Sequence, residues 1–228
     1  MYPSCAPTQM RGLDQVLHDR LPMNLGKKFR EVLDRANSEK TLQLLFEQHP
    51  AILLTSIVCH RTSWVFPRQS LPKPEGGSWI PDFMICDWTS VGPLWTIVEL
   101  ESPTAKATNT KGISGICRHA QQQIEDYRNH LQKHGAFLRD AGFLGIHGKC
   151  PAWIVIGRAE ERSIAERERL SHLRQYDIEV ASYDRFLKDC EEVIRNQAAS
   201  RRWWKALKSQ GPDQTVRSNR RRGTAPKR

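Results

Sequence analysis

The sequence predicts one α/β domain with a mixed central sheet that helices flank, and three observations support this. Helical stretches with an apolar face alternate with short apolar stretches along most of the 228 residues. The segments 78–88 and 94–101 are joined by TSVGP, which is typical of the turn in a β-hairpin. PAWIVIGR (151–158) is almost continuously apolar, as in a strand that is covered on both faces.

The other elements follow in order along the chain. Those before the hairpin are a helix over 26–35, a helix over 38–49, at least one strand within 51–58 and 62–68, and a loop over 70–77. Those after it are a polar loop over 102–115, a helix over 116–134, the strand within 151–158, a helix over 159–175, a strand over 177–182 and a helix from Tyr183 to about Ala198. The helix over 116–134 should bury one stripe of side chains, made of Ile116, Ala120, Ile124 or Gln123, Tyr127 and Leu131.

The net charge of +10 is concentrated at one end of the chain. Residues 201–228 hold ten basic side chains and one acidic side chain, so they carry +9, and residues 1–200 carry about +1. We therefore divide the chain into an N-terminal extension (1–35), the α/β domain (36–200) and a basic tail (201–228) that is expected to be disordered. The tail is either a solvated end or a salt-sensitive contact with phosphates, for which Arg220, Arg221 and Arg222 are candidates.

The cysteines and the hydropathy pattern indicate the cellular setting. The six cysteines are scattered, with no CxxC pair and no zinc-type spacing of cysteine and histidine. The sequence shows no signal peptide and no apolar run of about 18 residues. We expect a reduced, soluble, cytoplasmic protein that does not bind a membrane.

Acidic residues stand at the end of an apolar strand, in WTIVELESP (95–103). Glu99 and Glu101 are two residues apart, so both carboxylates leave the same face of the strand. Pairing through a turn near Val91 places Asp82 roughly opposite Glu99 or Glu101. Three clustered carboxylates suit Mg²⁺ or Mn²⁺, which could activate water against a phosphodiester, although acidic residues in strands often simply face solvent.

The order of the motifs resembles the PD-(D/E)XK nuclease superfamily and, more narrowly, the nuclease domain of the Shedu anti-phage defence proteins. The resemblance runs from about Glu39 to Leu187 and is carried by SEKTLQLLFEQHPAIL, IPDFMI, TIVELESP, HAQQQIEDYRNHL, WIVIGR and IEVASYDRFL. It implies a restriction-endonuclease-like fold and a nuclease that depends on Mg²⁺, with Mn²⁺ as a possible substitute. It also implies DNA as the nucleic-acid partner, a role in phage defence, and assembly into homo-oligomers.

The resemblance also implies roles for individual residues. Asp82 and Glu99 match metal ligands, and Glu39 matches an acidic residue that often completes such sites, although it could simply complement the helix dipole. Gln123 matches a glutamine that orients water or a site carboxylate, but it could merely border the apolar stripe. Arg158 could bind phosphate or cap its strand, and the structural reading is favoured.

The sequence departs from the superfamily pattern where a lysine usually follows the second acid by two residues. Glu101 stands there, and it reverses the sign of the charge beside the scissile phosphate. Glu101 could be an extra metal ligand, Lys106 or Lys111 could supply the positive charge, or the site could be silent. The first two are favoured because ELE before Ser-Pro resembles a variant within the Shedu-like group. The rival functions are a nucleic-acid-binding or regulatory module without chemistry, and an interaction protein that binds a basic partner.

Overall fold

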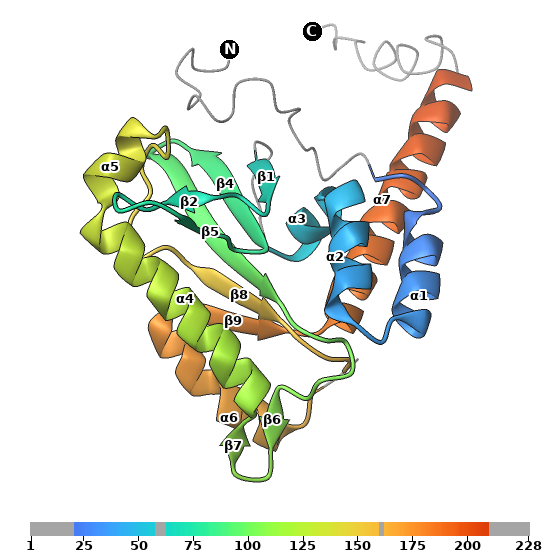
Figure 1. The fold of residues 1–228 in the computed structure, drawn as a ribbon. Helices are drawn as coiled ribbons and strands as arrows, with labels where there is room; N and C mark the ends of the chain where they lie inside the picture. Colours follow the sequence, from blue (N-terminus) through green and yellow to red (C-terminus); the bar gives the residue numbers. More distant parts are fainter. Residues whose placement is uncertain (1–20, 58–62, 160–161, 210–228) are drawn as a thin grey trace, which may run out of the picture.

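A five-stranded mixed sheet forms the centre of the molecule. The computed structural model describes residues 21–57, 63–159 and 162–209. The sheet has the order β1 (Ser63–Pro67), β4 (Phe83–Thr89), β5 (Gly92–Leu100), β8 (Ala152–Val155) and β9 (Ile178–Ala181). The first three strands pair antiparallel, whereas β8 and β9 run parallel to β5 (Figure 1). The predicted α/β fold with a mixed sheet between helices is confirmed.

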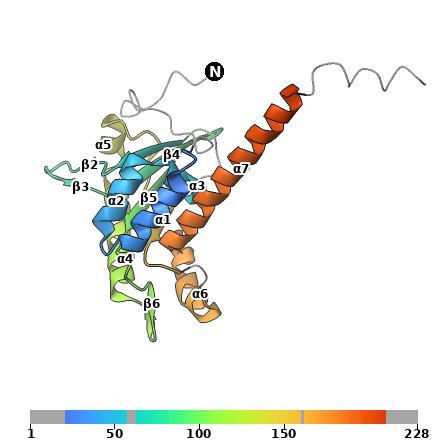
Figure 2. The same cartoon turned by 90° about the vertical axis from the view of Figure 1, so that its right-hand side faces the viewer.

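Helices cover both faces of this sheet. One face packs against α4 (Gly115–Lys133), α5 (Gly135–Asp140), α6 (Ile164–Ser171) and the 3-10 helix η2 (His172–Tyr176). The other packs against α1 (Leu25–Arg35), α2 (Glu39–Gln48), α3 (Ala51–Ile57) and α7 (Tyr183–Ser209). Figure 2, turned by 90°, shows α1, α2 and α7 together in the layer on the second face.

Alternation along β5 assigns its side chains to the two layers. Trp95 and Ile97 belong to the hydrophobic cluster under α4, whereas Val98 and Leu100 belong to the cluster under α2 and α7. Side chains two residues apart share a face of a strand, so Glu99 lies on the same α4 face as Trp95 and Ile97. The fold therefore points a carboxylate into an otherwise apolar layer.

The long helix α4 begins at a serine cap and buries a regular stripe. The Ser114 hydroxyl accepts a hydrogen bond from the Cys117 N–H at 3.1 Å. The buried apolar stripe is Cys117, Ala120, Ile124, Tyr127 and Leu131, and buried His130 lies beside it. The prediction of Ile116 in this stripe is wrong, because the spacing of three and four residues starts at Cys117 and leaves Ile116 45% exposed.

Several predicted boundaries differ from the structure. The apolar segment 51–58 forms α3 up to Ile57, so the expected strand lies in the second stretch, at β1. The expected loop over 70–77 contains β2 (Leu71–Pro72), which pairs with β3 (Ser78–Trp79), so the predicted strand over 78–88 is interrupted before β4. The loop over 102–115 likewise contains the two-residue strands β6 (Thr108–Asn109) and β7 (Gly112–Ile113).

The two ends of the described chain also differ from the expected division. Leu25, Phe29 and Leu33 of α1 are at most 1% exposed in the core under α2 and α7, so α1 is part of the domain. The last helix, α7, runs to Ser209 rather than Ala198, so the first nine residues of the predicted tail are helical. Residues 1–20 and 210–228, with the arginine triplet at 220–222, lie outside the described residues. Within the described part of the chain, no helix is long and apolar enough to cross a membrane.

Candidate functional site

The end of the β4–β5 hairpin brings Asp82 and Glu99 together. A two-residue turn sets the register in which Phe83 pairs with Val98, so the next position along the ladder opposes Asp82 to Glu99. The Asp82 N–H donates to Glu99 Oε1 at 3.4 Å, and the Leu100 N–H donates to Asp82 Oδ2 at 2.8 Å. The opposition that the sequence predicts for these two acids is confirmed.

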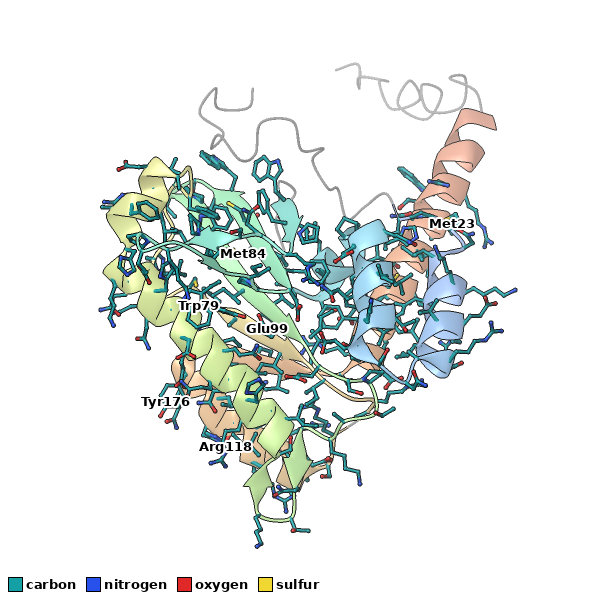
Figure 3. All side chains as sticks on the ribbon, in the orientation of Figure 1. Met23, Trp79, Met84, Glu99, Arg118 and Tyr176 are labelled. Carbon is teal, nitrogen blue, oxygen red and sulfur yellow. The ribbon has the colours of Figure 1, made fainter. Side chains whose placement is uncertain are left out.

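Glu99 is a buried carboxyl on the α4 face of the sheet (Figure 3). Burial raises its pKa to about 9, and the negative charge of Asp82 adds to the rise. The Tyr127 hydroxyl of α4 faces Glu99 and opposes part of this rise in pKa. A carboxyl held this way keeps its proton near neutral pH unless a cation replaces the proton.

Two more acids belong to the same cluster. Glu101, directly after β5, has its pKa raised to about 7 by burial and then by the charges of Glu39 and Asp82. Glu39, in the first turn of α2, has its pKa raised by burial and then by Asp82. The buried Tyr183 hydroxyl donates to the Glu101 backbone carbonyl at 2.8 Å, which fixes the chain where it leaves β5. Asp82, Glu99, Glu101 and Glu39 are therefore one electrostatically connected cluster, which we call the carboxylate cluster.

The carboxylate cluster suits a hard divalent cation in its chemistry. Its donors are carboxylate oxygens, and burial, followed by repulsion from the other acids, raises the pKa values of Glu39, Glu99 and Glu101. In the described ranges, however, no three Asp, Glu, His or Cys side chains are arranged as a formed metal site. Asp82 Oδ2 accepts from the Leu100 N–H, and Glu99 Oε1 accepts from the Asp82 N–H. A cation would therefore require these carboxylates to turn toward it.

A basic residue that the sequence does not point to, Arg68, lies beside the carboxylate cluster. The Arg68 N–H, just beyond β1, donates to the Asp82 carbonyl at 2.8 Å. The charge of its side chain lowers the pKa of Asp82 and of Glu39, against the effect of burial. Nothing in the local sequence marks Arg68, because its position depends on how β1 pairs with β4. Tyr127 was expected only as part of the apolar stripe.

The remaining candidates are not placed in the carboxylate cluster. Gln123 is half-buried on α4, one helical turn before Tyr127. Lys106 and Lys111 are exposed in the loop after β5, and Lys106 lines a cavity of about 180 Å³ with Arg158 and Arg162. A nearby lysine would lower the pKa of Glu101, but that pKa is raised by burial, Glu39 and Asp82, and neither lysine is among the groups that affect it.

Arg158 makes contacts that hold the fold together. Its guanidinium forms ion pairs of 2.9 Å with Asp34 of α1 and with Asp184 of α7. The glycine before it, Gly157, has a φ of +69°, and a Cβ there would collide with the Ala105 carbonyl oxygen. These contacts fix the chain after β8 against α1, α7 and the loop after β5, and they favour the structural reading of Arg158.

The comparison with known families agrees with this geometry. The family model described as "Shedu protein SduA, C-terminal" matches residues 36–187, which is more than half of the chain. The matched range contains the whole sheet, α2, α4 and all four members of the carboxylate cluster. A search of curated proteins gave no match. Membership of this family implies a role in anti-phage defence, and by this match the chain belongs to the Shedu SduA C-terminal family.

Proposed function

We propose that this chain is a divalent-metal-dependent nuclease that hydrolyses phosphodiester bonds, with DNA as its substrate, in anti-phage defence. The observation that carries the proposal is the pairing of Asp82 with Glu99 at the end of the hairpin, inside the range matched by the family model. Two further acids, Glu39 and Glu101, share the electrostatics of that pair. Both the resemblance to PD-(D/E)XK nucleases and the carboxylate cluster favour Mg²⁺, with Mn²⁺ as a substitute.

The roles of the individual residues follow from their surroundings. Asp82, Glu99 and Glu101 would hold the cation, and Glu39 would contribute a further carboxylate from the first turn of α2. Once bound, the cation supplies a polarised water and neutralises charge on the phosphate. Tyr127 orients Glu99 through its hydroxyl, and the Leu100 N–H orients Asp82. Glu101 loses its proton at about pH 7 in the free protein, so it becomes an anionic ligand near neutral pH.

The charge distribution supports a nucleic-acid partner. The chain from residue 201 onward carries +9 of the net charge of +10, and such a segment attracts phosphates without sequence preference. In this account the carboxylate cluster performs the chemistry and the basic end raises the local concentration of substrate. Assembly into homo-oligomers remains a prediction, which the molecular mass in solution would test.

A catalytically silent module of the same fold is the second candidate function. It is favoured by Glu101 at the position where the superfamily usually has a lysine, and by the absence of a formed three-ligand metal site in the described residues. Such a module would bind nucleic acid or regulate a partner without cutting. It predicts DNA affinity that survives loss of Glu99.

Cleavage of DNA distinguishes the two candidates. Supercoiled and linear DNA would be incubated with the wild type, Glu99→Gln and the control Glu125→Gln, each with Mg²⁺, Mn²⁺ or EDTA. Glu125 is a half-buried carboxylate on α4 that accepts a hydrogen bond from Gln121, so the control removes one similar charge outside the carboxylate cluster. We expect cleavage by the wild type and Glu125→Gln with either metal, and none by Glu99→Gln or with EDTA. Metal-independent cleavage, or full activity of Glu99→Gln, would refute the proposal.

A further inference from the structure

Three strand ends form a row at the carboxylate cluster. Pro67 of β1 pairs with Phe83 of β4, and beyond this pair the Arg68 N–H donates to the Asp82 carbonyl at 2.8 Å. On its other side, Asp82 donates its own N–H to Glu99 Oε1. Arg68, Asp82 and Glu99 are therefore neighbours on adjacent strands, although 31 positions separate the first from the last in the sequence.

The backbone of Arg68 has an unusual conformation. Its φ is +48°, in the left-handed region that residues with a Cβ seldom adopt. Among the described residues, the other non-glycine position with positive φ is Asp177, which ends η2. Strained backbone of this kind persists where the surroundings fix it, and it is concentrated at functional sites. Arg68 thus occupies a position where the backbone geometry favours glycine.

The side chain of Arg68 is exposed and acts on the carboxylate cluster. The bond from its N–H to the Asp82 carbonyl keeps Arg68 beside the carboxylate cluster, and its charge favours the ionised forms of both Asp82 and Glu39. Arg158 contrasts with it, because two carboxylates already pair with that guanidinium. Lys106 borders a cavity shared with Arg158 and Arg162. Within the part of the chain that the structure describes, Arg68 is the cation that perturbs these carboxyls.

We propose that Arg68 is a catalytic residue that binds the scissile phosphate and supplies the positive charge that Glu101 cannot. The inference rests on the proposed nuclease function. A guanidinium can donate two parallel hydrogen bonds to phosphate oxygens, and it keeps its proton throughout the reaction. The oxygen of water forms the new bond to phosphorus and gives up a proton to solvent, the bond to the leaving sugar oxygen breaks, and that oxygen takes a proton from solvent. Arg68 stabilises the charge that develops on the phosphate oxygens during this exchange.

Four variants test this role. Arg68→Gln removes the charge, Arg68→Lys keeps it, and Arg68→Gly removes the side chain while relieving the strained φ. Arg139→Gln is the matched control, because Arg139 is an exposed arginine on α5, beyond the C-terminal end of α4. Each variant is measured for the cleavage rate across metal concentrations and for its melting temperature, and Lys106→Gln is measured in parallel.

The expected changes in rate, metal dependence and melting temperature differ from those of a variant that merely destabilises the fold. Arg68→Gln and Arg68→Gly should lose about 100-fold or more in the maximal rate, because a charge aimed at the transition state is removed. Both should reach half-maximal rate at the same or a lower metal concentration, since a positive charge beside the carboxylates is gone. The melting temperature of Arg68→Gly should be unchanged or higher. Arg68→Lys should recover part of the rate, and Arg139→Gln should match the wild type.

Two outcomes would overturn the assignment of Arg68. One is cleavage by Arg68→Gln within about threefold of the wild type while Glu99→Gln is inactive, because loss of a charge aimed at the transition state costs far more than this. The other is a loss of maximal rate in Lys106→Gln that Arg68→Gln does not show. A wild type that cuts no DNA with either metal would instead overturn the nuclease function, and the catalytic role of Arg68 with it.

Discussion

Leu100 and Asp82 are joined across the end of the β4–β5 ladder by a hydrogen bond of 2.8 Å from the Leu100 N–H to Asp82 Oδ2. This bond uses a backbone donor of β5 to hold a carboxylate of the neighbouring chain segment beside Glu99. It also lowers the pKa of Asp82, although burial raises that pKa by more. The end of the hairpin thus concentrates carboxyl groups in a half-buried place, so both the stability of the protein and its affinity for cations should depend on pH.

The stability of the metal-free protein should fall as the pH rises. The pKa of Glu99 is about 9 in the folded state and near 4.5 in the unfolded state. Below 4.5 both states hold the proton. Between the two values the unfolded chain releases it and the folded protein keeps it, so the free energy of unfolding decreases up to about pH 9. These two pKa values correspond to a loss of at most about 6 kcal/mol across this range.

Urea denaturation at several pH values checks this prediction. The Glu99→Gln variant lacks the titrating group, so its stability should vary less with pH than that of the wild type. Glu125→Gln should follow the wild-type curve, because Glu125 lies outside the carboxylate cluster. If the free energy of unfolding varied with pH in the same way for the wild type and Glu99→Gln, Glu99 would titrate as an ordinary glutamate.

Tyr127→Phe should lower both the stability of the protein and the metal affinity of the carboxylate cluster without removing any of its carboxyl groups. The variant deletes the hydroxyl that donates to the buried Glu99, and the ring remains to fill the core. Loss of one hydrogen bond to a buried group should cost about 1–2 kcal/mol of stability. The metal concentration for half-maximal cleavage should also rise, because Glu99 is less well oriented and holds its proton more tightly. A metal dependence identical to that of the wild type would argue against an orienting role.

Glu101→Gln tests whether the glutamate at the lysine position is a ligand. The substitution keeps the size and removes a carboxyl that titrates at about pH 7. We expect weaker metal binding, a cleavage rate that excess Mn²⁺ partly restores, and loss of the rise in rate around pH 7. If the variant equals the wild type in rate, metal dependence and pH profile, Glu101 has no part in the site.

Deletion of residues 210–228 should weaken DNA binding mainly at low salt. The segment begins after the end of α7, and it holds six basic side chains and one acidic side chain. On duplex DNA, the slope of log affinity against log salt should fall by about 0.9 for each phosphate that the shortened protein no longer neutralises. The melting temperature should not change, since the described core ends before this segment. Unchanged affinity and slope would show that the basic end is only a solvated terminus.

The hairpin and the apolar runs could be predicted because local chemistry determines them. Counting residues outward from Val91 places Asp82 opposite position 100, so the sequence predicts either Glu99 or Glu101 as its neighbour, and the two-residue turn that pairs Thr89 with Gly92 selects Glu99. The apolar run at β8 is explained by its parallel neighbours β5 and β9. The same patterns predict a mixed sheet between helices, but not the strand order or the face that each helix covers.

Other features depend on contacts that the local sequence does not encode. A short apolar run such as Ala51–Ile57 suits either a helix or a strand, and its packing beside α7 decides for the helix. Arg68 reaches the carboxylate cluster only through the pairing of β1 with β4 and a left-handed backbone. The first buried position of the α4 stripe is Cys117 rather than Ile116, because positions three and four residues before Ala120 both suit one helix face and packing selects between them.

Calorimetric titration of Mn²⁺ into the wild type and Glu99→Gln, in buffers of different ionisation enthalpy, tests the central claim most directly. The account predicts that the wild type binds Mn²⁺ with a net release of protons, because the cation displaces protons from Glu99 and Glu101, whose pKa values are about 9 and about 7. Glu99→Gln should bind at least about tenfold more weakly and release fewer protons. Equal affinity of the two proteins for Mn²⁺, with no proton release from either, would contradict the account.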